Sequence, residues 1–128
     1  MRKICVTLLT FIALGVVSTH AADIVPMDSD LMLTIEETND SLSSNIAMEE
    51  GEAALMDAEI LAELFVSVET HYKNEPDSEE AYDLTLKSNA LIAQIIEQVK
   101  GNDFESAANS ATDLARTCKS CHNFYKED

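Results

Sequence analysis

Residues that break helices are scarce in this chain, and those beyond residue 25 stand where stretches of helical periodicity end. The whole chain has only three glycines and two prolines. Gly51, Pro76 and Gly101 divide the part that follows Pro26 into four segments of similar length. Each segment repeats apolar residues at intervals of three and four, the spacing of one face of an α-helix, and none alternates as a strand does. We therefore predict four amphipathic helices.

The four predicted helices have recognisable starts and stops. The first begins near Asp28 and ends near Gly51, and the second covers residues 53–72. Ser78 is expected to cap the third helix, Gly101 ends it, and the fourth follows at once. The predicted inward faces, in chain order, are Met32, Ile35, Leu42 and Ile46 with polar Asn39 among them; Ala54, Ala58, Leu61, Phe65, Val68 and Tyr72; Ala81, Leu84, Ser88, Leu91, Ile95 and Val99; and Phe104, Ala107, Ala111, Leu114, Cys118, Cys121 and Tyr125.

Four amphipathic helices joined by short connections predict an all-α fold, namely an antiparallel up-down-up-down four-helix bundle. The predicted inner faces are rich in Ala and Ser. Small residues usually mean that helices pack closely, but they can also leave room for a large flat ligand between helices. The residues concerned are Ala54, Ala58, Ser88, Ala107 and Ala111.

The N-terminal residues have the pattern of a secretory signal. Two of the first three residues are basic, residues 4–17 are almost wholly apolar, and small residues follow up to Ala22. We therefore predict that residues 1–21 form a signal peptide and that residues 22–128 form the mature domain. Cleavage of the signal peptide would remove Cys5. An uncleaved anchor is the weaker alternative, because the apolar stretch is short for a bilayer span.

The predicted mature domain is strongly acidic. The chain has 8 Lys and Arg against 24 Asp and Glu, a formal net charge of −16. Arg2 and Lys3 belong to the predicted signal, so six basic residues remain against 24 acidic ones, a net charge of −18. Such a charge argues against nucleic acid and anionic membranes as partners. It favours a basic protein partner, although a surface that merely keeps the protein soluble would have the same composition.

Cys118, Cys121 and His122 form a Cys-x-x-Cys-His motif in the fourth predicted helix. On a helix these three positions share one face. Two thiols so placed can bond to the two vinyl groups of a haem, and the imidazole that follows can bind its iron. We therefore predict covalent attachment of one haem c per chain, with Cys118 and Cys121 as the attachment residues and His122 as the proximal iron ligand.

Three other interpretations of the motif remain open. A structural zinc site needs four ligands, and only His71 is left as a distant nitrogen donor besides carboxylates. A thioredoxin-like redox pair belongs with a β-α-β pattern, which the sequence lacks. A disulfide in a haem-free structural bundle would close a very small loop and needs no histidine.

At these residues the chain resembles the four-helix-bundle cytochromes, namely cytochrome b562 and the class II cytochromes c that include cytochrome c′. The likeness in layout covers the mature domain, and it is most specific in residues 107–126, where Leu114, Thr117, His122 and Tyr125 fall in register with the b562 pattern. The b-type protein lacks the two cysteines. The resemblance implies a periplasmic haem protein whose role is electron transfer. Cytochromes c′ often pair through their first two helices, but the acidic charge favours a monomer or weak homodimer and a basic periplasmic redox partner.

The second axial ligand of the iron is left open by the sequence. The low-spin members of the family supply a methionine from the first helix, and an ungapped match puts Ile35 at that position. Met32 lies one turn earlier on the same face and is the possible sixth ligand, with Met27 and His71 as poorer candidates. If Met32 is only a core residue, the iron is five-coordinate and high-spin, and the protein could bind NO or CO as cytochrome c′ does.

Further residues are expected around the haem. Leu84, Ser88 and Leu91 of the third helix are expected to wall it, and an apolar wall raises the reduction potential. Arg116 and Lys119 could pair with the haem propionates, although a solvated face is the simpler interpretation for each. We expect no enzyme, because the sequence offers no paired distal base and arginine of the peroxidase type.

Overall fold

The computed structural model describes residues 25–125, and the predicted signal peptide at residues 1–21 lies outside this range. The described residues form four helices. They are α1 (Ser29–Ala47), α2 (Gly51–Asn74), α3 (Glu79–Lys100) and α4 (Phe104–Tyr125).

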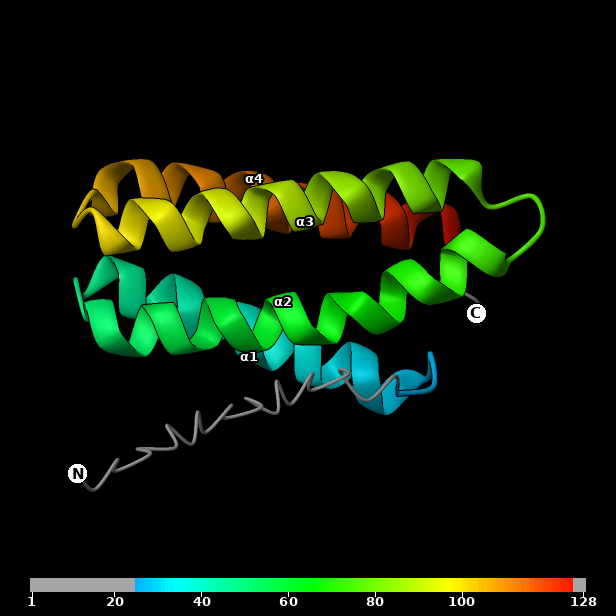
Figure 1. Cartoon of the computed structure of the whole chain (residues 1–128), viewed down its shortest axis with the longest axis horizontal. Coiled ribbons are helices and arrows are strands. Elements are labelled where there is room, and N and C mark those ends of the chain that lie inside the picture. Colours follow the sequence, from blue (N-terminus) through cyan, green and yellow to red (C-terminus); the bar gives the residue numbers. More distant parts are fainter. Residues whose placement is uncertain (1–24, 126–128) are drawn as a thin grey trace, which may run out of the picture.

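The four helices run alternately up and down (Figure 1). Each packs against the next in the chain, and α4 packs back against α1 over the least extensive of the four interfaces. The structure thus confirms the predicted all-α, antiparallel up-down-up-down bundle. None of the helices between residues 25 and 125 combines the length and the apolar content that a membrane span requires.

Up-and-down packing brings four helix ends together. The start of α1, the end of α2, the start of α3 and the end of α4 lie at one end of the bundle (Figure 1). Cys118 and Cys121 belong to this end, which we call the cysteine end.

A single apolar core runs between the helices. Its largest fully buried side chains come from all four helices, and burying each stabilises the fold by about 1.5–3 kcal/mol. They are Leu42, Ile46, Leu61, Ile92, Ile95 and Leu114.

The observed inner faces differ from the predicted ones in three places. Leu31 is buried, whereas its neighbour Met32 is only half-buried. On α3, Thr85 and Ile92 are buried, while the predicted Leu84 and Leu91 are half-buried. The burial of Thr85 is tolerated because its hydroxyl donates to the main-chain oxygen of Ala81 over 2.8 Å, and therefore leaves no unpaired donor in the core.

Gly51 begins α2 rather than ending α1, which corrects the predicted boundary. The turn between them contains Glu49 at φ 58, and α1 already ends at Ala47. A Cβ atom on Gly51 would lie 3.4 Å from the ring of Phe104. This is an ordinary contact distance, so the start of α2 lies beside the first turn of α4 without requiring glycine at this position.

Side-chain capping supports the starts of α1 and α4, and α3 begins directly after Ser78 as predicted, without the expected cap bond. Asp28 accepts the main-chain N–H of Leu31 over 2.9 Å at the start of α1. Asp103 accepts the N–H of Ser106 over 3.1 Å at the start of α4, and bonds from Ser106 lower the pKa of the Asp103 carboxyl. Ser78 precedes α3 but makes no cap bond with its side chain.

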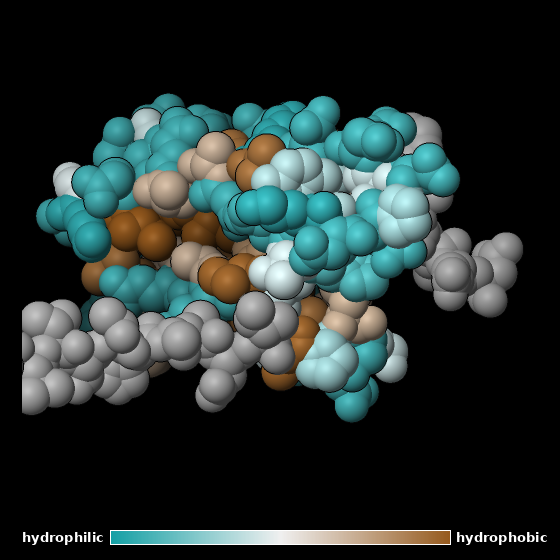
Figure 2. Space-filling view, turned by 45° about the vertical axis from the view of Figure 1, so that its right-hand side comes forward, coloured by the Kyte–Doolittle hydropathy of each residue, from teal (hydrophilic) through white to brown (hydrophobic). Residues whose placement is uncertain are grey.

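The outer surface is mostly hydrophilic, with apolar residues exposed in separate patches on the face that Figure 2 shows. Most of the large apolar side chains that are exposed belong to α1, to α2 or to the residues that flank α1, and Leu86 on α3 is the exception. The others are Val25, Leu33, Met48, Met56, Ile60 and Val66.

Candidate functional site

The last turns of α4 place both cysteines toward the inside of the bundle. Cys118 and Cys121 are half-buried, and Cys118 packs against the apolar core. Both are free thiols in the structure. His122 follows Cys118 by four residues, one helical turn further on, and its side chain is exposed. The two thiols therefore face inward while the imidazole lies at the edge of the cysteine end.

The environment of the two thiols favours their neutral forms. Burial, and next the nearby charge of Cys121, raise the pKa of Cys118 to about 11. Burial also raises the pKa of Cys121, against a smaller opposing effect of a hydrogen bond with Tyr72. Redox-active Cys-x-x-Cys pairs have lowered pKa values that keep one thiolate available. The pair in α4 has the opposite tendency, which weighs against the thioredoxin-like interpretation.

Tyr72 of α2 is a member of this site that the sequence did not identify as one. It was predicted only as an inward-facing helix residue. The structure puts it at the end of α2, half-buried against the core, where it opposes the rise in the pKa of Cys121 on α4. Because this partner lies 49 positions further on (121 − 72), no local spacing in the sequence could reveal the pair.

Met32 lies in the first turn of α1, at the cysteine end. It is half-buried and packs against the core, and Met27, just before the helix, does the same. Ile35 is buried, with 6% of its surface exposed. Since α1 packs against α4, the half-buried thioether of Met32 belongs to the helix beside the one that carries the cysteines.

The predicted wall residues lie on α3, the other neighbour of α4. Ser88 is buried, and its hydroxyl donates to the main-chain oxygen of Leu84 over 3.0 Å. Leu84 and Leu91 are half-buried, and Leu91 packs against the core. The small side chain of Ala81 is fully buried at the same end of α3. Ala81, Leu84, Ser88 and Leu91 are all uncharged, and α3 therefore contributes uncharged side chains next to α4.

Three other predicted residues have ordinary surface roles or local contacts. Arg116 donates to Asp113 over 2.9 Å at an exposed position, where such pairs stabilise little. Lys119 is exposed. His71 is half-buried rather than fully solvent-facing, and its ring meets that of Tyr72 edge-on with 4.9 Å between ring centres.

The donor set at the cysteine end suits a c-type haem. Two free thiols one turn apart can make thioether bonds, the adjacent imidazole is a nitrogen ligand, and α1 offers a half-buried sulfur. The same residues suit a zinc site less well. The described part of the chain contains no group of three or more His, Cys, Asp or Glu side chains that could hold a metal ion.

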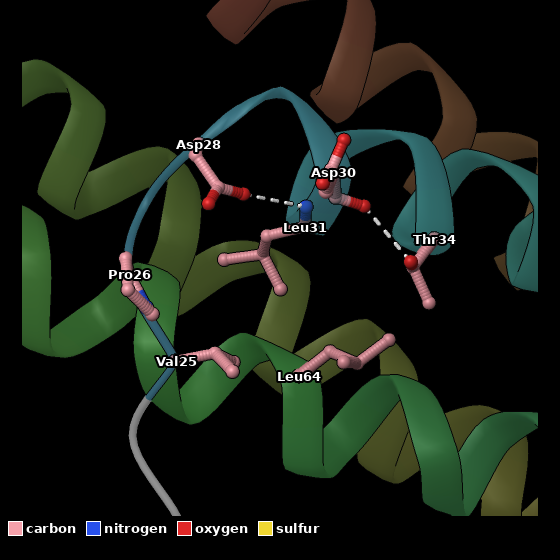
Figure 3. Close-up of a pocket in the computed structure, with 7 residues that line it drawn as sticks. All are labelled: Val25, Pro26, Asp28, Asp30, Leu31, Thr34 and Leu64. Carbon is pink, nitrogen blue, oxygen red and sulfur yellow. Dashed lines mark hydrogen bonds between the residues drawn. The ribbon is translucent and has the colours of Figure 1, made fainter.

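A small pocket lies between the start of α1 and α2, on the α1 side of the cysteine end (Figure 3). Its volume is about 220 Å³. It is lined by Val25, Pro26, Asp28, Asp30, Leu31, Thr34 and Leu64. The Asp28 and Thr34 side chains beside it already bond to the main chain of α1, and none of the predicted site residues lines it. The pocket therefore shares no lining residue with the predicted site, although Leu31 adjoins Met32 in the chain.

Comparisons with protein-family models, with curated proteins and with solved structures each gave no match to this chain. The arrangement of Cys118, Cys121, His122 and Met32 at one end of the bundle is accordingly the basis for assigning a function.

Proposed function

We propose that this protein is a periplasmic c-type haem protein of the four-helix-bundle cytochrome kind and that it acts as a small electron carrier. One observation carries the proposal: Cys118 and Cys121 face inward one turn apart on the last turns of α4, with His122 directly after them. Two thiols and an imidazole in this order are the attachment and ligation set of haem c.

Each residue has a distinct role in this proposal. Cys118 and Cys121 hold the cofactor through thioether bonds, and His122 supplies the proximal nitrogen ligand. Met32 supplies sulfur from α1 as the sixth ligand. The bound haem supplies one-electron chemistry between its ferric and ferrous states. Leu84, Ser88 and Leu91 keep the α3 side of the site free of charge, which favours the ferrous form and raises the potential.

The surface supports a basic redox partner. The connection between α2 and α3 lies at the cysteine end with exposed Glu75 and Asp77, and the first turn of α3 adds exposed Glu79 and Glu80. Long-range attraction to a basic protein raises the association rate and weakens as salt is added. The net negative charge of the chain also opposes self-association, so we propose a monomer or a weak homodimer.

A second candidate function has its own support in Met32. Leu31 is the buried residue of that turn, whereas Met32 is half-buried and packs against the core like an ordinary gap-filling methionine. If the sulfur of Met32 does not bind the iron, the protein is a five-coordinate, high-spin haem protein of the cytochrome c′ kind. It then binds CO or NO on the side of Met32 and Ile35.

Optical spectra of the protein exported by a host that attaches haem c test the proposal. We expect a c-type spectrum that is low-spin in both oxidation states, with haem that acid solvent does not extract. The matched control is the double variant Cys118→Ala/Cys121→Ala, whose haem, where present, should be extractable. Exported wild-type protein without haem contradicts both functions, and rapid CO binding to a high-spin ferrous form supports the second.

A further inference from the structure

A stripe of apolar side chains lies along the outer side of α2. Met56, Ile60 and Leu64 follow one another at intervals of four residues, so they share one face of the helix. Met56 is 58% exposed and Ile60 is 40% exposed, whereas Leu64 is half-buried. The three side chains therefore form a partly exposed apolar surface, which we call the α2 stripe.

One end of the α2 stripe enters the pocket between α2 and the start of α1. Leu64 lines this pocket together with Val25 and Leu31, and Figure 3 shows the three side chains around it. Val25 is 43% exposed, so the apolar surface continues past Leu64. Asp28 and Asp30 line the same pocket. The stripe thus leads to a hollow of about 220 Å³ that can admit a bulky apolar side chain and has two carboxylates beside it.

The charges around the α2 stripe are all of one sign. Residues 25–70, which span α1 and most of α2, contain twelve Asp and Glu and no Lys or Arg. Exposed Glu59 and Glu63 follow Met56 and Ile60 by three positions, and Glu37 is exposed on the neighbouring α1. The Lys and Arg side chains of the described residues all lie within 73–119. This surface therefore combines exposed apolar groups with negative charge alone.

These charges select among the possible occupants of the surface. A second copy of the chain would bring the same carboxylates and no cation from residues 25–70, so repulsion opposes pairing through this face. An anionic membrane is repelled for the same reason. A basic amphipathic helix complements both features. Its apolar side chains, spaced by three and four, match the stripe, and the lysines or arginines at their edges face the carboxylates.

We propose that the α2 stripe is a docking site for a basic amphipathic helix of a partner protein, one apolar side chain of which enters the pocket beside Leu64. This interaction goes beyond the proposed function, because neither the stripe nor the pocket includes a predicted haem-site residue. The mature chain binds such a helix with or without haem, and the absence of haem from the exported protein would leave the proposal intact.

A synthetic peptide is the probe. It is an amidated helix with leucine at spacings of three and four and lysine at its other positions, and its control has glutamate in place of lysine. Titration of the lysine peptide into isotope-labelled mature protein, followed by NMR, should shift the amide signals around Met56, Ile60 and Leu64. The affinity should fall as salt is added. Shifts confined to α3 and α4, or equal binding of the glutamate peptide, overturn the proposal.

One pair of variants tests the apolar contribution. Ile60→Gln keeps a good helix former at an exposed position and should weaken binding of the lysine peptide by about fivefold. Leu86→Gln, on α3, is the matched control, because Leu86 is 41% exposed against 40% for Ile60, and it should leave binding unchanged. Circular dichroism checks that both variants keep their helix content. Equal affinities of the two variants overturn the proposal.

A second pair tests the position of the charges. Glu59→Gln/Glu63→Gln removes two carboxylates beside the α2 stripe and should weaken binding of the lysine peptide several-fold. Glu79→Gln/Glu80→Gln removes the same charge from the exposed first turn of α3 and should weaken it much less. An equal loss in both double variants would mean that the peptide responds only to net charge, which overturns the proposal.

Discussion

The hydroxyl of Ser78 donates to the main-chain oxygen of Tyr72 over 2.8 Å and also to that of Glu75 over 2.8 Å. The residue just before α3 thereby shares its one hydroxyl proton between two carbonyl groups at and just after the end of α2, which no helical N–H can reach. The same bond fixes the backbone that carries Tyr72. The connection between the two helices is thus part of what shapes the cysteine end.

Ser78→Ala should destabilise the fold by about 1–2 kcal/mol, because two carbonyl groups beside a buried position lose their donor. Urea unfolding followed by circular dichroism measures this change. Ser43→Ala, at an exposed position on α1, is the matched control and should lie within about 0.5 kcal/mol of the wild type. Equal midpoints for the two variants would show that the Ser78 bonds contribute nothing.

Leu114→Ala should cost about 2–5 kcal/mol, since it removes a core side chain that is only 1% exposed and leaves a cavity beside the cysteine-bearing turns. Leu86→Ala is the control, because Leu86 is 41% exposed and little of its contact area is lost. Thermal unfolding of both variants checks the difference. A smaller loss of stability for Leu114→Ala than for Leu86→Ala would contradict the burial of Leu114 in the core.

The haem-free chain should lose stability at alkaline pH. Burial raises the pKa of Cys118 from 9.0 to about 11, so the folded state retains a proton that the unfolded state has lost between these values. The stabilisation is complete below about pH 9 and disappears as the pH rises toward 11, an effect on the order of 1–3 kcal/mol. Denaturant unfolding at several pH values measures it in protein produced without haem attachment.

One variant and haem attachment test the origin of that alkaline loss. Cys118→Ala should reduce the dependence on pH between 9 and 11, because the buried titrating group is gone. Attachment of haem should remove the contribution of the thiols altogether, because thioethers do not titrate. An unchanged alkaline loss in Cys118→Ala would mean that another group is responsible.

Met32→Ala should convert a low-spin holoprotein into a high-spin one that binds CO rapidly, because it removes the proposed sulfur ligand. Met27→Ala is the matched control: Met27 is also half-buried and packs against the core, but it precedes α1. Absorption spectra of the oxidised and reduced forms report the spin state. A Met32→Ala spectrum identical to that of the wild type would exclude Met32 as a ligand, and if both spectra are high-spin it would favour the gas-binding alternative.

The helices could be predicted from the sequence because their signals are local. The three-and-four spacing around Leu61 and Leu114 identified faces that are indeed buried, and Gly101 marked the end of α3. Gly51 was misassigned as the end of α1, because α1 ends at Ala47 and the left-handed residue of the turn is Glu49 rather than a glycine. A non-glycine residue rarely adopts this conformation, so the sequence pointed to the wrong position.

The site was less accessible to prediction than the fold. Polar Thr85 and Thr117 were not expected in the core, yet each is 2% exposed, because its hydroxyl bonds back to its own helix. The effect of Tyr72 on the pKa of Cys121 depends on the arrangement of α2 and α4 in the bundle. The Cys-x-x-Cys-His motif, in contrast, could be found at once, because its chemistry lies in consecutive positions.

The intact mass of the mature protein, exported by a host that can attach haem c, tests the central claim most directly. The account predicts the mass of the chain from Ala22 onward plus one haem, with the haem retained after acid treatment and located by digestion on the peptide that contains Cys118 and Cys121. A mature chain of the unmodified polypeptide mass, produced by a host that attaches haem to a known c-type cytochrome in parallel, would contradict it.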